Sequence, residues 1–354
     1  MGCSMRVSVD ETDVIAPNFK KRLSGVTSTI VQLIPLQRKK GIRISTIGPG
    51  LPDSLPSLGY SSLLKLWKRP DGKPFRIWHA RRNVEMVAGI LLRDLLRMKL
   101  KLIFTSAAQR HHKPFTNWLI RRMDKVIATS ARSGSFLEVP YRVIMHGIDL
   151  DRFTPPATFE DTFQSTKLPG KYAVGCFGRV RHQKGTDLFV DAMIELLPHY
   201  PDWTAIITGR TTAEHKDFEK ELERKIAAAG LQKRILILGE VDDIRVWYRR
   251  VTLYVAPSRN EGFGLTPLEA MASKTAVVAS DAGAYQELVT EGTGTVVPAG
   301  DGKALTEAIK PYLANPEKTI AMGEKALEHV QKDFPLNKEA SSIDEVYQEV
   351  FTQK

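Results

Sequence analysis

The sequence predicts an α/β protein of two Rossmann-like, doubly wound domains facing a cleft, with helices at the C-terminus. Short β-branched runs alternate with longer helical stretches along most of the chain, which is typical of parallel sheets with crossover helices. A length of 354 residues suits two domains with separate cores. Pro155, Pro156, Pro169 and Gly170 fall in a stretch without periodicity near the middle, which indicates a connection between the domains.

The expected strands follow from this alternation. In the first half they are residues 6–9, 42–46, 75–79, 101–105, 125–129 and 141–145, and in the second half residues 172–177, 204–208, 235–238, 253–256, 276–279 and 295–297. Helices without further strands follow Pro311 and Pro316. We therefore predict domains at 5–153 and 172–335, a linker at 154–171, and a C-terminal helix at 336–354 that packs back on the first domain. Residues 1–4 are interpreted as a leader.

Charge is distributed unevenly along the chain. Residues 1–150 hold 26 Lys and Arg against 10 Asp and Glu, a net charge of +16, while the remaining residues hold 25 against 30, a net charge of −5. The basic half predicts an anionic partner, and nucleic acid, an anionic membrane and a phosphorylated or carboxylated substrate all stay open. A merely solvated basic face is the alternative.

Other features restrict the class of protein. No apolar run reaches the roughly 18 to 20 residues that a membrane-spanning helix needs, and the N-terminus lacks the apolar core of a signal peptide. Cys3 and Cys176 lie far apart without a metal-binding spacing, so neither a disulfide framework nor a structural zinc site is indicated. We expect a cytoplasmic protein, with the cytoplasmic face of the inner membrane as a second location.

The first chemical motif is the segment 178–185, which reads GRVRHQKG between a predicted strand and a predicted helix. A loop bounded by glycines at a helix N-terminus offers backbone N–H groups to a phosphate, and Arg179 and Lys184 add full charges. The segment lacks the spacing of a P-loop or of a dinucleotide-binding turn. On its own it fits a diphosphate site or a solvated basic turn.

The second motif is the segment 257–272, PSRNEGFGLTPLEAMA, which follows the strand predicted at 253–256. Thr266 is the expected N-cap of a helix with Pro267 in its first turn. Glu269 then completes a capping box in one interpretation, or points at a ligand in the other. Glu261 has no structural explanation. Carboxylates beside a phosphate site are favourable where they accept hydrogen bonds from sugar or ribose hydroxyls.

Together these motifs resemble family 4 of the retaining glycosyltransferases. The resemblance runs from the Ser24-Gly25-Val26 loop through the HGID segment at 146–149 to the DAGA segment at 281–284. It implies the GT-B fold, with the acceptor bound by the first domain and a nucleotide-sugar by the second. The residues implied for donor binding are Gly25, Arg179, Lys184, Glu240, Val241, Glu261, Gly262, Phe263, Gly264, Leu265, Thr266 and Glu269.

The resemblance also implies roles in catalysis. Arg179 and Lys184 would hold the diphosphate and stabilise the leaving nucleotide in place of a metal ion, and Glu261 would contact the hydroxyls of the donor sugar. No cofactor or metal is expected. The sequence Asp149-Leu150-Asp151 is similar to a metal-binding DxD motif, but it falls in the family's interdomain segment. His79 is the candidate for a catalytic histidine in the cleft, with a purely structural histidine as the alternative.

Within the family, the chain most resembles lipopolysaccharide core mannosyltransferases. This similarity implies GDP-mannose as the donor and the Kdo region of a lipid A precursor as an anionic glycolipid acceptor. Segments 91–101 and 111–122 combine apolar and basic residues, as a peripheral contact with an anionic membrane would, although the leucines at 91, 92, 95 and 96 fit a buried helix face better. Another nucleotide-sugar, an epimerase and a nucleic-acid-binding protein remain alternatives, and no nucleic-acid-binding motif is present.

Overall fold

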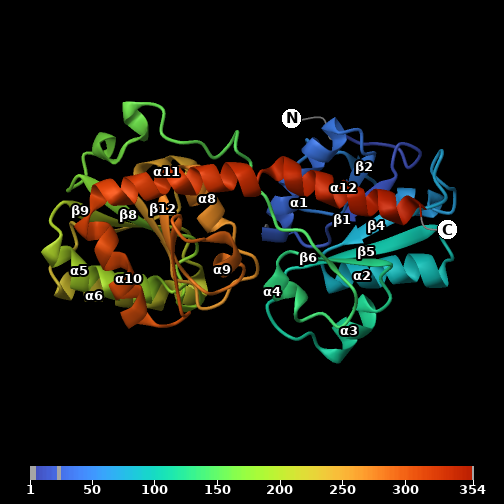
Figure 1. Cartoon of the computed structure of the whole chain (residues 1–354). Helices are drawn as coiled ribbons and strands as arrows, with labels where there is room; N and C mark the ends of the chain where they lie inside the picture. Colours follow the sequence, from blue (N-terminus) through green and yellow to red (C-terminus); the bar gives the residue numbers. More distant parts are fainter. Residues whose placement is uncertain (1–4, 22–24, 353–354) are drawn as a thin grey trace. The chain divides into compact units, whose positions relative to one another are not determined.

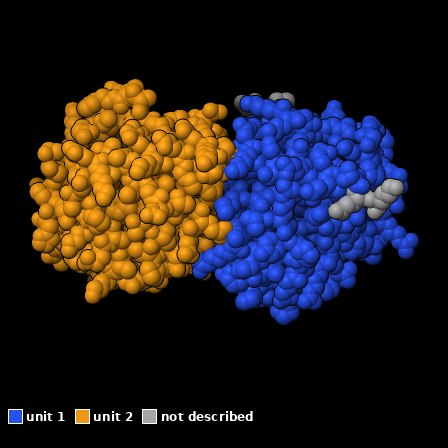
Figure 2. Space-filling view, viewed as in Figure 1, with its two compact units in different colours: residues 1–147, 336–354 blue, residues 148–335 orange. Residues whose placement is uncertain are grey.

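The computed structural model describes residues 5–21 and 25–352, so residues 1–4 and Ser24 lie outside the described residues. The chain forms two compact units (Figures 1 and 2). Unit 1 runs to Gly147 and resumes at Leu336, whereas unit 2 comprises Ile148–Pro335. The expected linker at 154–171 lies inside unit 2, where Arg249 donates to Asp161 at 2.6 Å and Phe163 is buried. The chain therefore crosses between the units at Gly147 and again at Pro335.

The described part of unit 1 is built on a parallel seven-stranded sheet of order β3-β2-β1-β4-β5-β6-β7. Its strands are β1 (Val14–Pro17), β2 (Ile44–Ile47), β3 (Ser57–Leu58), β4 (Arg76–Ala80), β5 (Leu100–Ser106), β6 (Lys125–Ala128) and β7 (Arg142–Val143). Successive strands run outward from β1 in one direction and outward from β4 in the other. The loops after β1 and β4 therefore diverge, and they form the crevice where doubly wound sheets bind ligands.

Helices cover both faces of this sheet. They are α1 (Gly25–Lys39), α2 (Asn83–Ile90), α3 (Pro114–Ile120), α4 (Ala131–Gly134) and α12 (Leu336–Thr352). One face packs Trp78, Met86 and Leu102 together. The other face joins Ile34 of α1 to Tyr347 of α12, so the last helix of the chain supplies part of the core of unit 1.

Unit 2 repeats the architecture with a parallel six-stranded sheet of order β10-β9-β8-β11-β12-β13 in the described residues. Its strands are β8 (Tyr172–Phe177), β9 (Trp203–Thr208), β10 (Ile235–Gly239), β11 (Leu253–Ala256), β12 (Ala276–Ser280) and β13 (Gly294–Val297). Here the order reverses between β8 and β11. The loops that carry the two chemical motifs therefore leave the sheet at its switch point.

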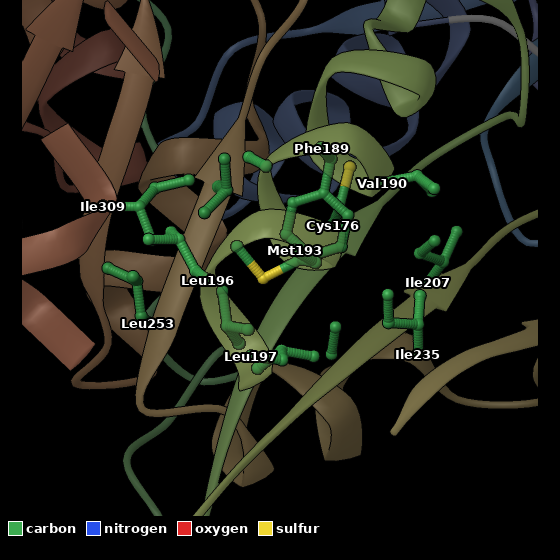
Figure 3. Packing of buried hydrophobic residues seen from close by; sticks show 14 of the residues in the cluster. Cys176, Phe189, Val190, Met193, Leu196, Leu197, Ile207, Ile235, Leu253 and Ile309 are labelled. Carbon is green, nitrogen blue, oxygen red and sulfur yellow. The ribbon is translucent and has the colours of Figure 1, made fainter. Parts of the chain in front are cut away.

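The helices of unit 2 are α5 (Thr186–Leu196), α6 (Lys216–Ala228), α7 (Ile244–Arg250), α8 (Thr266–Ala272), α9 (Tyr285–Leu288), α10 (Gly302–Ala314) and α11 (Pro316–Asp333). Figure 3 shows how Phe189 and Met193 of α5 pack with Ile309 of α10 over the strands. Cys176 lies in the same cluster. Burial raises the pKa of its thiol to about 12, so this free cysteine stays protonated and unreactive at neutral pH. The predicted fold class, two doubly wound α/β domains with C-terminal helices, is confirmed.

The first predicted strand is wrong. Residues 6–9 form only an isolated bridge between Arg6 and Ser57, and the inner strand is β1, in which all four residues are buried. Pro17 ends β1, and a proline argues against an inner strand because it cannot donate a ladder hydrogen bond. The parallel pairing of Val14 with Ile44 and with Ile77 nevertheless places β1 between two neighbours. Pairing with β2 and β4 therefore decided the position of this strand, against the preference of its proline for an edge strand.

The interpretation of the leucines at 91, 92, 95 and 96 as a buried face is also wrong. They lie in a π-helical turn, η2 (Leu91–Leu95), and its C-cap. Only Leu92 is buried, whereas Leu95 is 70% exposed and Leu91 and Leu96 are exposed as well. The π-helical turn explains the error, because an α-helical projection assigns these side chains to the wrong face.

Lys274, at the C-terminal end of α8, has a left-handed backbone with φ of 66°. A side chain costs about 1–2 kcal/mol in this conformation, and glycine returns about 0.5–1 kcal/mol of that through its greater freedom in the unfolded chain. Lys274→Gly should raise the free energy of unfolding by about 0.5–1 kcal/mol in urea titrations. A loss of stability would instead show that the exposed ion pair between Lys274 and Glu324 outweighs the backbone strain.

Across the described residues, we find no helix with the length and apolarity required to cross a membrane.

Candidate active site

The loop after β8 is shaped by glycines. Gly178 and Gly185 have φ angles of 130° and 70°, and Gly185 contacts the backbone of Pro257 so closely that an added Cβ would lie 1.9 Å from the Pro257 oxygen. Gly185 is the N-cap of α5 and has no side chain to cap this helix end. Backbone N–H groups there can therefore bind an anion, except that of Asp187, which donates to its own carboxylate. Arg179 and Lys184 line the adjoining cavity.

Arg259 joins this loop to the loop after β11 through hydrogen bonds. Arg259 donates through both terminal nitrogens to the carboxylate of Asp187 at 2.7 Å, and through Nη1 also to the carbonyl of His182 at 2.7 Å. Its backbone N–H donates to Gln183 at 2.9 Å. Burial alone would raise the pKa of Asp187, but the hydrogen bonds from Arg259 outweigh it and lower that pKa. The two motifs thus form one preorganised structure.

Lys184 and Glu261 form an ion pair across these loops. Each side chain is 20% exposed, so the pair lies at the mouth of the site and partly in contact with solvent. Glu261 Oε1 also accepts from the N–H of Gly262 at 3.3 Å. The Glu261 carboxylate neutralises the charge of Lys184 in this structure, so a diphosphate that binds Lys184 would compete with Glu261 for it.

Glu269 does not act as the capping residue that the sequence allowed. The helix begins at Thr266, one residue earlier than predicted, with Leu265 as its N-cap and no side-chain cap among the described residues. Glu269 instead accepts a hydrogen bond from the hydroxyl of Tyr248 at 2.7 Å. Burial raises its pKa, against the opposing effects of this hydrogen bond and of the charge on Lys184. A half-buried carboxylate whose other oxygen has no hydrogen-bond partner among the described residues suits a hydroxyl ligand.

The loop after β12 supports the loop that carries Glu261. Gly283, with φ of 62°, packs against the carbonyls of Gly262 and Phe263, and the N–H of Ala284 donates to Phe263 at 3.0 Å. Phe263 itself is buried, so this residue offers its backbone and not its ring to a ligand. Ala284 is fully buried.

Two buried polar atoms beside this site were not singled out from the sequence. Arg181 Nε and Thr208 Oγ1 have no hydrogen-bond partner in the described structure. Thr208 ends β9, whose following residue Gly209 packs against the carbonyl of Gly178. The position of Arg181 inside the GRVRHQKG segment was the available signal. Unsatisfied polar atoms beside a binding loop mark places where a ligand or water completes the hydrogen bonds.

The remaining candidates lie in different places. Glu240 and Val241 directly follow β10, at the same carboxyl edge of the unit 2 sheet as the two motifs. Gly25 begins α1 in unit 1. Asp149 accepts from the N–H groups of Asp151 and Arg152 and so stabilises a local turn. In the described residues no group of three or more His, Cys, Asp or Glu is arranged to hold a metal ion.

His79 has a structural environment. It is fully buried at the end of β4, where Nδ1 is 2.7 Å from the Tyr347 hydroxyl and Nε2 is 2.7 Å from Thr105 Oγ1. Burial, with a smaller effect from the charge on Arg81, holds its pKa well below the usual value. Both ring nitrogens are therefore engaged inside the core, and we do not retain His79 among the proposed catalytic residues.

This burial predicts a pH dependence of stability. Because the folded state favours neutral His79, the stabilisation is complete above the ordinary histidine pKa of about 6.5 and is lost as pH falls towards the lower folded pKa. The contribution is up to about 1.4 kcal/mol per pH unit. In urea unfolding, the free energy of unfolding should fall less between pH 7 and pH 5.5 in His79→Gln than in wild type. Exposed His199→Gln serves as the control, and equal losses in all three proteins would contradict the prediction.

Comparisons with known proteins find relatives that span nearly the whole chain. Residues 158–329 match the family model described as glycosyl transferases group 1. The chain is 65% identical over 340 residues to the lipopolysaccharide core biosynthesis mannosyltransferase LpcC of Rhizobium leguminosarum bv. viciae, covering 96% of this chain and 97% of that protein. It is 55% identical to LpsB of Rhizobium meliloti, which bears the same description, with 97% and 99% covered. Anabaena HepE, solved with UDP and glucose, shares the fold with a TM-score of 0.80 at 20% identity, covering 95% of this chain and 99% of that one.

Proposed function

The chain belongs to the group 1 glycosyltransferases and within them to the lipopolysaccharide core mannosyltransferases, and we propose that it transfers mannose from GDP-mannose to the Kdo region of a lipid A precursor. A nucleotide-sugar donor and a glycan acceptor follow from the family. This membership favours transfer over the epimerase and nucleic-acid alternatives. The observation that carries the proposal is the joined pair of loops at the switch point of unit 2, with Arg179, Lys184 and Glu261.

The donor diphosphate binds Arg179, Lys184 and the open N-terminus of α5. Glu261 accepts hydrogen bonds from hydroxyls of the donor sugar, and Glu269 accepts from the ribose. Support for these roles comes from the half-buried carboxylates and from the cavity that Arg179, Lys184 and Thr266 line. Glu240 and Val241 contact the base.

The reaction proceeds with retention of the anomeric configuration. The bond between C1 of the sugar and the diphosphate oxygen breaks, while a bond from C1 to the acceptor oxygen forms on the same face. The departing diphosphate takes the proton of the acceptor hydroxyl and leaves as GDP. Because negative charge develops on the leaving group, the charges on Arg179 and Lys184 stabilise the transition state more than the ground state. We propose that these two cations act without a metal ion.

Unit 1 also presents a surface suited to an anionic membrane. Three short elements expose large apolar side chains: η1 (Tyr60–Lys65), η2 and α3. Trp118 of α3 stacks on Phe115 and lies under the guanidinium of Arg122, whose centre is 4.3 Å from the ring. Arg93 of η2 donates to the Arg122 carbonyl at 3.0 Å, which holds the η2 turn beside α3. Aromatic, leucine and arginine side chains on one surface are typical of an interfacial contact.

Transfer of labelled mannose from GDP-mannose to a Kdo-bearing lipid A precursor in detergent tests the main proposal. We expect transfer that persists in EDTA and is lost in Glu261→Ala, with UDP-glucose and GDP-glucose as donor controls. Transfer abolished by EDTA and restored by a divalent cation would overturn the metal-independent mechanism. Tight GDP binding without transfer would retain the donor site and reject this acceptor.

Partitioning onto liposomes tests the membrane contact. Leu95→Ser combined with Trp118→Ser should reduce co-sedimentation with vesicles containing phosphatidylglycerol by about tenfold, because both side chains lose apolar burial in the interface. Ile320→Ser, at a 42% exposed position in unit 2, is the matched control. Equal sedimentation of all three proteins, or of wild type with neutral and anionic vesicles, would reject the anionic membrane contact.

A further inference from the structure

Two adjacent arginines follow β4 at the switch point of unit 1, and they differ in how their charges are satisfied. Arg82 donates to Asn18 Oδ1 at 2.7 Å, to Glu85 Oε1 at 2.8 Å and to Thr27 Oγ1 at 3.2 Å. Asn18 in turn donates to Pro49 at 2.6 Å, so Arg82 ties together the loops after β1, β2 and β4. Arg82 is therefore part of the framework of this edge of the sheet.

Arg81 has no comparable partner. Its guanidinium makes a single hydrogen bond, from Nη1 to the carbonyl of His79 at 3.3 Å, and no carboxylate of a described residue forms an ion pair with it. The nearby Glu85 carboxylate instead accepts from the Arg81 backbone at 2.7 Å and from Arg82. Burial, the largest effect, lowers the pKa of the Arg81 guanidinium, and the charges of Glu85, Glu339 and Tyr347 raise that pKa without a hydrogen bond to it.

A partly buried arginine normally satisfies its donors inside the protein. Arg76, which lies fully buried in β4, donates to the carbonyls of Thr12, Val9 and Lys68. Removing a guanidinium from water without such partners is unfavourable, and a planar fork of free N–H groups matches the two oxygens of a carboxylate or phosphate. Arg81 has these free donors in the crevice where a doubly wound sheet binds ligands.

We propose that Arg81 binds an anionic group of the glycolipid acceptor, a carboxylate of an acidic sugar or a phosphate of the lipid. The inference rests on the proposed function, in which unit 1 binds the acceptor. It assigns one residue of the basic half to recognition of the substrate, whereas its neighbour Arg82 serves the framework of this edge of the sheet. Arg81 is a positioning residue that places the acceptor hydroxyl, and it leaves donor binding unchanged.

Steady-state transfer with three acceptors tests the assignment: the intact Kdo-bearing lipid A precursor, its carboxyl methyl ester, and its dephosphorylated form. On the intact acceptor, Arg81→Gln should lower kcat/KM at least about 30-fold through acceptor KM, and Arg81→Lys about tenfold, with the KM for GDP-mannose unchanged. On the acceptor that lacks the recognised anion, wild type should fall to the level of Arg81→Gln. That acceptor identifies the source of the anion.

Arg142→Gln, in which an exposed ion pair with Glu345 is removed, is the matched control, and thermal melts of each variant report folding. The assignment would be overturned if Arg81→Gln lowered kcat/KM by the same factor on all three acceptors. It would also be overturned if the acceptor KM of Arg81→Gln equalled that of Arg142→Gln. Binding of the acceptor without donor, followed by tryptophan fluorescence, separates the two proposals. Wild-type binding that Arg81→Gln weakens, without transfer by either protein, would reject the proposed function and retain this site.

Discussion

Replacing Gly185 by alanine is expected to lower the rate of sugar transfer by about a hundredfold or more. An added Cβ would lie 1.9 Å from the Pro257 carbonyl oxygen, and the backbone has φ of 70° at this position. The loop after β8 must therefore move away from the loop after β11. This displaces Lys184 and the first N–H groups of α5 from the diphosphate, and loss of one such electrostatic contact costs about 10²–10³ in rate.

Gly230 provides the matched control for this variant. It has the same φ of 70°, but an added Cβ would meet no atom within 4 Å. Gly230→Ala should therefore lower the free energy of unfolding by the backbone cost alone, about 1 kcal/mol, and leave transfer unchanged. Steady-state rates and thermal melts of the two variants measure the difference. Equal activities in both would show that contact between the two loops does not control the donor site.

The unit 2 fold was largely predictable because its signals are local. Strands such as β8 and β11 are short apolar runs, and their bounds match the prediction for 172–177 and 253–256. The positive φ angles of Gly178 and Gly185 explain why the segment 178–185 needs glycine at both ends. Motif spacing therefore located the loops of the candidate site.

Side-chain partners across those loops were not predictable. Arg259 follows Asp187 by 72 residues and Tyr248 precedes Glu269 by 21, so no periodicity connects them, and only the sheet order brings them together. The same limit applies to His79, whose hydrogen bond to Tyr347 joins residues 268 positions apart. From the sequence alone, a histidine at a strand end fits catalysis and burial equally well.

Separate substitutions of Lys184 and Glu261 should have opposite effects on the binding of free GDP. Lys184→Gln removes the positive charge that would stabilise the leaving diphosphate. We therefore expect weaker GDP binding and a transfer rate about 10²–10³-fold lower. Glu261→Gln releases Lys184 from its ion pair and removes a negative charge beside the diphosphate, so GDP should bind up to about tenfold more tightly. Transfer should nevertheless fall about a hundredfold, because Glu261 holds the sugar.

Calorimetric titration with GDP and steady-state transfer measure these two effects on the same proteins. Lys171→Gln removes an exposed lysine that pairs with Asp202 in unit 2, and it should leave both quantities unchanged. In the variant with both substitutions, the activation free energy of transfer should rise by less than the sum of the two single increases. The reason is that each single substitution leaves the other charge unpaired.

The sign of the change in GDP binding decides what Glu261 does. If the carboxylate only positioned Lys184, Glu261→Gln would weaken GDP binding and transfer together, because Lys184 would lose its orientation. If Glu261 binds sugar hydroxyls, its loss removes that contact from GDP-mannose and the transition state, whereas GDP, which carries no sugar, loses no contact and gains the released Lys184. Tighter product binding with slower transfer would then have a single physical cause. In the proposed mechanism, a donor whose sugar hydroxyls bind Glu261 would release Lys184 from this ion pair to the diphosphate.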